Sequence, residues 1–126
     1  MKRAKAGSYW RKKLNGLLRE LVSLRDGERC LKCGKRSQLH MSHIYPKGRY
    51  RCMEFNPDNL KLLCVGCHLF WWHKNPIEAS EWIKTALTPQ RLKRLRMLSL
   101  ETVKVDAEVQ AGLLKKKIAA LRLKNR

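Results

Sequence analysis

The cysteines of this chain fall into two close pairs, which is the spacing of metal ligands. Cys30 and Cys33 form the first pair, Cys64 and Cys67 form the second, and residues 34–63 lie between them. Each C-x2-C pair can form a tight turn that presents two thiolates, and two such turns complete one tetrahedral zinc site. The sequence therefore predicts a structural zinc ion held by all four. The fifth cysteine, Cys52, is expected to be a free or buried thiol.

Two histidines between the pairs offer a competing ligand set. His40 and His43, taken with the first cysteine pair, read C-x2-C-x6-H-x2-H. That spacer is much shorter than the ~12 residues of a C2H2 zinc finger, and the set would leave Cys64 and Cys67 without a role. The four-cysteine site is therefore preferred. Both histidines are then available for hydrogen bonding in a small core or for chemistry.

The net charge indicates a polyanionic partner. The chain of 126 residues has 29 Lys and Arg against 10 Asp and Glu, a formal net charge of +19. Such self-repulsion is tolerable when lysines and arginines release counterions from phosphates on binding. The 44% hydrophobic content favours a folded nucleic-acid-binding domain over a disordered basic tail. A ribosomal-type protein and a cationic membrane-surface peptide are the plainer alternatives.

No stretch of the sequence reads as a secretory signal or a membrane span. The basic start is not followed by a continuous apolar region, and no segment approaches the ~20 apolar residues that cross a bilayer. We therefore expect a cytoplasmic location and no membrane partner.

Apolar periodicity and caps predict an α+β chain. Helices are expected over residues 8–25, 67–75, 75–87, 88–98 and 105–124, and extended runs over 38–45 and 50–55. Ser8, Asn75 and Thr88 are the expected N-caps, and Gly27 follows the first helix. Phe70, Trp71 and Trp72 are expected in the core rather than as a base-stacking platform.

Three units follow: a basic N-terminal helix (1–26), a zinc-stapled core (27–75) and a basic helical extension (76–126). The last helix could fold back on the domain, order only on nucleic acid, or pack against a second copy. The last arrangement would give a homodimer through the C-terminal helices.

The residues around the second cysteine pair carry a family resemblance. "SHIYP" followed by "FNPDNLKLLCVGCH" resembles the His-Asn-His (HNH) endonucleases, whose pattern joins "HI-x-P" to "N-L-x-x-L-C-x-x-C-H". His43, Asn59 and His68 match its three named positions. The cysteine frame and the "LRDGERC" lead-in are similar to the zinc-stapled branch, and the resemblance covers about residues 24–74. The continuation "WWHKNPIEASEW" resembles phage recombination nucleases of the NinG/Rap type.

The resemblance implies a small ββα-metal (His-Me finger) core that hydrolyses DNA phosphodiester bonds. It implies that His43 is the general base, that Asn59 holds the base-bearing loop, and that His68 binds a catalytic Mg²⁺ or Mn²⁺. It further implies branched DNA as substrate and a phage-infected or prophage-bearing bacterial host. Lys47, Arg49 and Arg51, on the loop after the base, are expected to contact phosphates, although a solvated turn explains them equally well.

One position departs from the family pattern. Many members carry an aspartate before the first histidine, where this chain has Ser42, a weak neutral ligand. Besides the endonuclease, a second hypothesis is therefore a zinc-stabilised nucleic-acid-binding module without strong catalysis. A third is a basic adaptor between proteins. His40 and His73 are expected to be structural, with His40 a candidate to assist in holding the catalytic ion.

Overall fold

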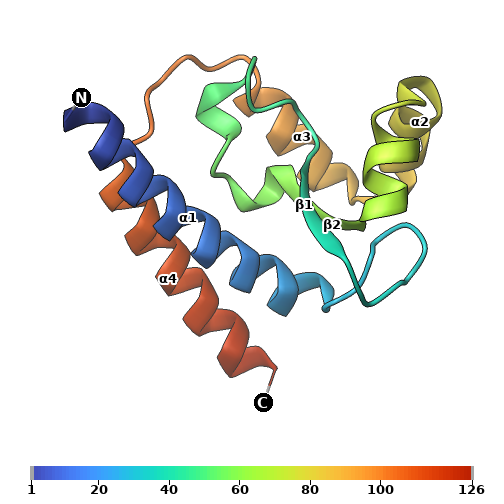
Figure 1. The fold of residues 1–126 in the computed structure, drawn as a ribbon, viewed down its shortest axis with the longest axis horizontal. Helices are drawn as coiled ribbons and strands as arrows, with labels where there is room; N and C mark the ends of the chain where they lie inside the picture. The colour runs from blue at the N-terminus through green and yellow to red at the C-terminus, as the bar shows by residue number, and fades with distance from the viewer. Residues whose placement is uncertain (1, 126) are drawn as a thin grey trace.

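The computed structural model describes residues 2–125, and helices surround a small central sheet (Figure 1). In chain order the elements are α1 (Lys2–Asp26), β1 (Leu39–His43), the 3₁₀ turns η1 (Arg51–Met53) and η2 (Pro57–Asn59), β2 (Leu60–Cys64), the π-helical η3 (Gly66–Trp72), α2 (Pro76–Ala86), α3 (Pro89–Leu98) and α4 (Ala107–Lys124). The α+β expectation is confirmed, with helices flanking two antiparallel strands.

The sheet pairs β1 with β2 in antiparallel register. Leu39 lies opposite Cys64, and His43 lies opposite Leu60. All five residues of β2 are buried, because Leu60 and Leu62 belong to a core with α1 and α4 while Leu63 packs on the cysteine side. Coverage of both faces explains why this strand is almost continuously apolar.

The first predicted extended run, 38–45, is confirmed by β1, whereas the second was placed wrongly. Residues 51–53 form the η1 turn, and the partner strand is Leu60–Cys64. The reason lies between the two: the side chain of Asn56 accepts a hydrogen bond from the Asp58 N–H, and Pro57 follows in the η2 turn. The turn therefore continues through Asn59, and β2 begins only at Leu60.

The long terminal helices pack side by side and run in the same direction (Figure 1). Near their C-terminal ends, Arg122 pairs with Glu20, and Asn125 Nδ2 donates to the Leu24 carbonyl at 3.3 Å. The fold-back alternative for the last helix is therefore confirmed, while the homodimer stays a prediction. Helix α1 begins at Lys2, so Ser8 is not its cap.

The other predicted helix boundaries had mixed outcomes. Gly27 follows α1 with φ of +84°, and the Thr88 side chain accepts from the Arg91 N–H at 3.2 Å, both as expected. Asn75 precedes α2 but makes no side-chain capping bond. Trp72 packs at the edge of the core, whereas the Phe70 side chain is 65% exposed, so its placement in the core was wrong.

Two half-buried arginines fix the start of β2. Arg25 Nη2, from α1, donates to the Leu60 carbonyl at 2.7 Å, and Arg91 Nη2, from α3, donates to the same oxygen at 2.9 Å. Arg25 also donates to the Pro57 carbonyl and Arg91 to the Asp58 carbonyl. Helices distant in sequence are thus tied to one point of the sheet.

We expect Leu114→Ala to lower the free energy of unfolding by about 2–5 kcal/mol, because it empties a fully buried site between α1 and α4. The neighbouring Leu113 is 47% exposed, so Leu113→Ala makes the same helical substitution and should cost less than about 1 kcal/mol. Urea unfolding of both variants measures the difference. Equal losses would show that the α1–α4 contact contributes little.

Candidate functional site

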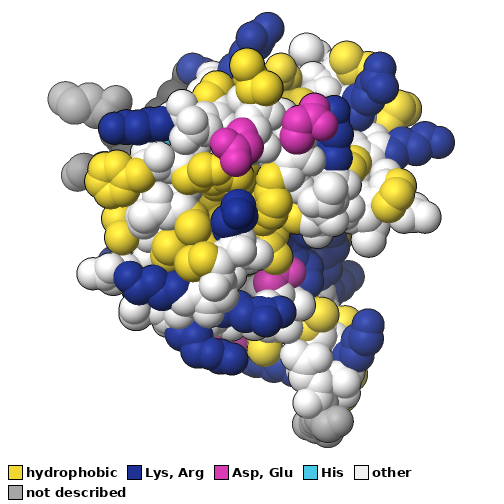
Figure 2. Space-filling view, turned by 90° about the vertical axis from the view of Figure 1, so that its right-hand side faces the viewer, with side chains coloured by type: hydrophobic (Ala, Val, Ile, Leu, Met, Phe, Trp, Pro, Cys, Tyr) yellow, Lys and Arg dark blue, Asp and Glu magenta, His cyan; other side chains and the backbone are white. Residues whose placement is uncertain are grey.

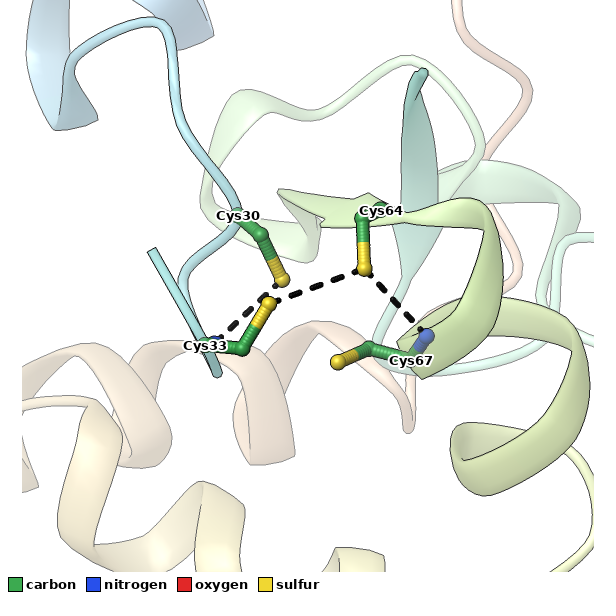
Figure 3. A group of neighbouring side chains, drawn as sticks. All are labelled: Cys30, Cys33, Cys64 and Cys67. Atoms are coloured by element: carbon green, nitrogen blue, oxygen red, sulfur yellow. Dashed lines mark hydrogen bonds between the residues drawn. The ribbon is translucent and has the colours of Figure 1, made fainter. Parts of the chain in front are cut away.

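The four paired cysteines converge at one end of the sheet, where β1 begins and β2 ends (Figure 3). Cys30 and Cys33 lie in the loop after α1, Cys64 ends β2, and Cys67 lies in the first turn of η3. Their Sγ atoms all lie within 4.8 Å of one another, and Cys33 Sγ is 3.7 Å from Cys64 Sγ. Tetrahedral coordination with Zn–S bonds of ~2.3 Å gives S···S edges of about 3.8 Å.

Both cysteine pairs form the same kind of turn. The N–H of Cys33 points at Cys30 Sγ (3.5 Å), and the N–H of Cys67 points at Cys64 Sγ (3.4 Å). Burial opposes ionisation of Cys30, but backbone N–H donors outweigh it and lower the pKa of this thiol to about 7. Burial and the three neighbouring sulfurs raise the pKa of Cys67.

A cation bound among the four sulfurs would let all four cysteines ionise, because four thiolates this close repel one another unless a positive charge lies between them. The convergence predicted from the C-x2-C spacing is therefore confirmed. The four cysteines could hold a metal ion, and the donor set is consistent with structural zinc.

His43 ends β1 with one ring nitrogen tied to the backbone. Its Nε2 lies 2.9 Å from the Glu54 carbonyl oxygen. A carbonyl can only accept, so Nε2 carries the proton of the neutral ring and Nδ1 keeps a lone pair. Burial lowers the pKa of His43, and the nearby Lys47 charge adds to this. The imidazole is therefore neutral at pH 7, with Nδ1 able to accept a proton.

Asn59 lies behind His43 and is fully buried. Its Oδ1 accepts from the Tyr45 N–H at 2.8 Å, while Nδ2 donates to the carbonyls of Tyr45 (3.0 Å) and Met53 (3.2 Å). Its own carbonyl accepts from the Ile44 N–H at 2.9 Å. The side chain thus joins the loop that leaves β1 to the η1 turn that returns to β2. It lies too deep to touch a substrate.

Three of the four histidines form a chain of contacts. His68, on η3, places Nδ1 3.2 Å from Nδ1 of His40 and Nε2 3.0 Å from Nε2 of His73. His40 lies on β1, but three residues from His43, so the two project from opposite faces of the strand. Burial, followed by the charges of His73 and His40, lowers the pKa of His68 to about 4. His68 is therefore neutral at pH 7.

A cleft of about 810 Å³ brings His43, His68 and His73 together between the end of β1, η3 and α2. Lys47 also lines it, whereas Arg49 and Arg51 are exposed on the same loop outside the lining. Asp and Glu are absent from the lining among the residues that the structure describes. The cleft is therefore a positively charged site in which His43 and His68 are neutral.

Sequence reasoning missed Lys61, which lies opposite Ser42 in the sheet. Both are buried, and Lys61 Nζ donates to Ser42 Oγ at 3.0 Å while lying 3.4 Å from the centre of the Trp72 ring. Ser42 therefore faces the lysine rather than the cleft. Burial, with a contribution from Arg91, lowers the pKa of Lys61 to about 6. The signal available in the sequence was a lysine inside the apolar run "LKLLC".

Comparisons with known proteins gave no match, so any conclusion about function depends on the residues of this chain. No family model matches the chain, and no curated protein and no solved structure matches it. Among residues 2–125, no helix combines the length and apolarity needed to cross a bilayer.

Removal of zinc should unfold the core cooperatively, because the ion joins the loop after α1 to the end of β2 and the start of η3. We expect Cys33→Ser to lose stoichiometric zinc and to melt at a lower temperature than the native protein. Cys52→Ser is the matched control, since Cys52 lies outside the four-sulfur group and contacts the Leu98 and Glu101 carbonyls. Metal analysis and thermal unfolding with and without a chelator measure both. An unchanged melting curve after chelation would show that zinc does not stabilise the fold.

The buried lysine should make stability depend on pH. Between pH ~6 and ~10 the unfolded chain binds a proton at Lys61 that the folded chain does not, so stability rises with pH in this window. We expect Ser42→Ala/Lys61→Met, which removes both hydrogen-bonding partners, to be more stable than the native protein by about 1–4 kcal/mol near pH 6. The gain should shrink toward pH 10.

Urea unfolding at pH 6, 8 and 10 measures the gain, with Lys93→Met, an exposed lysine on α3, as control. A gain that is the same at all three pH values would contradict a lowered pKa at Lys61.

Proposed function

We propose that this protein is a metal-dependent DNA endonuclease of the HNH type, in which β1, β2 and η3 form a ββα-metal core stapled by zinc. The observation that carries the proposal is the cleft shared by His43 and His68. These residues come from different elements 25 positions apart, and one of them has a neutral, proton-accepting nitrogen. A binding module has no need of that arrangement.

His43 and its surroundings account for the proton transfer. Hydrolysis requires a water oxygen to attack phosphorus while the P–O bond to the leaving oxygen breaks, and a base must take the proton of the water. His43 Nδ1 takes it, while the bond from Nε2 to the Glu54 carbonyl holds the ring in place. Asn59 keeps the loop on either side of this pair fixed. The Lys47 ammonium, at the cleft wall, attracts the phosphate.

The ion that the HNH resemblance implies fits this cleft only in part. His68 offers a neutral imidazole, but Ser42 is turned toward Lys61 and no carboxylate lines the cleft among the described residues. A divalent cation held at His68 would supply positive charge to the scissile phosphate and the leaving oxygen.

The charge of the molecule suits a DNA partner. On the face that carries α2, lysine and arginine side chains lie around an apolar patch (Figure 2). Most acidic side chains that could offset this charge are occupied in ion pairs, as in Arg11–Glu54, Arg19–Glu28 and Arg94–Asp58. The remaining positive charge is available for phosphates flanking the cut, with Arg49 and Arg51 next to the cleft.

The described lining of the cleft holds no carboxylate, which supports one alternative, a zinc-stabilised nucleic-acid-binding module without strong catalysis. This alternative predicts DNA binding that weakens steeply as the salt concentration rises, and no strand scission whichever divalent ion is added.

We expect the protein to cut DNA, and we expect His43→Ala to slow the cut at least ~100-fold, since general bases contribute about 10²–10⁴. The assay uses supercoiled plasmid, linear duplex and a four-way junction, with Mg²⁺, Mn²⁺ or Ni²⁺. Faster cutting of the junction would support a role in phage recombination.

Gln90→Ala, an exposed change on α3 outside the cleft, should cut at the native rate. Zinc content and melting temperature check that both variants are folded. Unchanged cutting by folded His43→Ala would remove His43 from the mechanism.

A further inference from the structure

His40 and His68 present ring nitrogens to each other across the interface between β1 and η3. Their Nδ1 atoms are 3.2 Å apart, and the rings are nearly perpendicular at 88°. Two neutral imidazoles cannot approach in this way with both lone pairs facing, because like partial charges repel. Either a proton or a cation must lie between the two nitrogens.

We propose that His40 and His68 together hold one divalent transition-metal ion between their Nδ1 atoms. This deepens the proposed function, in which His68 alone was the assigned ligand, and it rests on that proposal only for the catalytic use of the ion. Bonds of ~2.1 Å from one ion to both nitrogens would meet at about 100°, which is close to the angle between neighbouring ligands in tetrahedral or octahedral sites.

His73 supports this assignment from the other side of His68. The two Nε2 atoms are 3.0 Å apart, so His68 can donate its Nε2 proton to His73. That tautomer leaves the lone pair of His68 on Nδ1, the atom that faces His40. Metal-binding histidines commonly donate their second ring nitrogen to an acceptor in this way, which fixes the ring and its tautomer.

The donor set defines the class of ion. Two imidazole nitrogens, with no carboxylate beside them among the described residues, suit imidazole-preferring ions such as Ni²⁺, Co²⁺ and Zn²⁺, whereas Mg²⁺ prefers oxygen ligands and keeps its waters. The buried Lys61 lies on the same face of the sheet as His40 and adds no negative charge. The site should therefore discriminate against Mg²⁺, in contrast to the Mg²⁺ or Mn²⁺ that the HNH resemblance implies.

The test is calorimetric titration of Ni²⁺ into the zinc-loaded full-length protein, without DNA and without an added histidine tag. Native protein should bind one equivalent of Ni²⁺, and Mg²⁺ should bind at least ~10-fold more weakly. His40→Ala and His40→Gln should each weaken Ni²⁺ binding by about 10-fold or more. Two variants are used so that the result does not depend on one of them folding, and zinc content with melting temperature verifies each.

His43→Ala is the matched control, because it removes another β1 histidine, one that lines the cleft with His68 and whose Nε2 is tied to the Glu54 carbonyl. It should bind Ni²⁺ as the native protein does, while losing cleavage. Ni²⁺ binding that is absent, or equal in the native protein and both His40 variants, would overturn the site. Mg²⁺ binding as tight as Ni²⁺ would overturn the ion class. His40-dependent binding in a protein that cuts no DNA would retain the site and reject the nuclease.

Discussion

The antiparallel pairing of β1 with β2 is the constraint on which the rest of the structure depends. It places Leu39 opposite Cys64, which closes the loop carrying Cys30 and Cys33 onto the second cysteine pair. At the other end it places His43 opposite Leu60, directly after Asn59. A slip of one residue would turn every side chain of β1 to the other face. The cysteine cluster and the histidine cleft are therefore positioned by the same few hydrogen bonds.

His43 and His40 project from opposite faces of β1 and contact different elements. His43 projects toward the side where Glu54 and the returning loop fix its ring, while His40 projects toward η3 and meets His68. The η3 helix carries both Cys67 and His68, so the cysteine cluster also fixes the position of His68. A metal ion bound by sulfur would in this way set the geometry of a second site bound by nitrogen.

Local sequence signals predicted most of the frame. The C-x2-C turns, Gly27 and the Thr88 cap depend on contacts within a few residues, and these predictions were confirmed. The partner strand was misplaced at 50–55 because a short apolar run such as Leu60–Cys64 shows no alternation when both faces are covered. The contact between His40 and His68 arises from long-range pairing, for which no local pattern exists. The burial of Lys61 also depends on long-range pairing, and its local sign was only a lysine inside an apolar run.

The arginines that meet at the Leu60 carbonyl have a consequence for self-association. A two-stranded sheet has outer edges whose free backbone groups can recruit a strand from another molecule. On the outer edge of β2, the Leu60 carbonyl is occupied by Arg25 and Arg91, and the Leu62 carbonyl by the Leu31 N–H at 2.8 Å. An incoming strand would find both acceptors taken by charged or backbone donors. This edge is closed to strand addition, so the most apolar segment of the sheet cannot seed aggregation there.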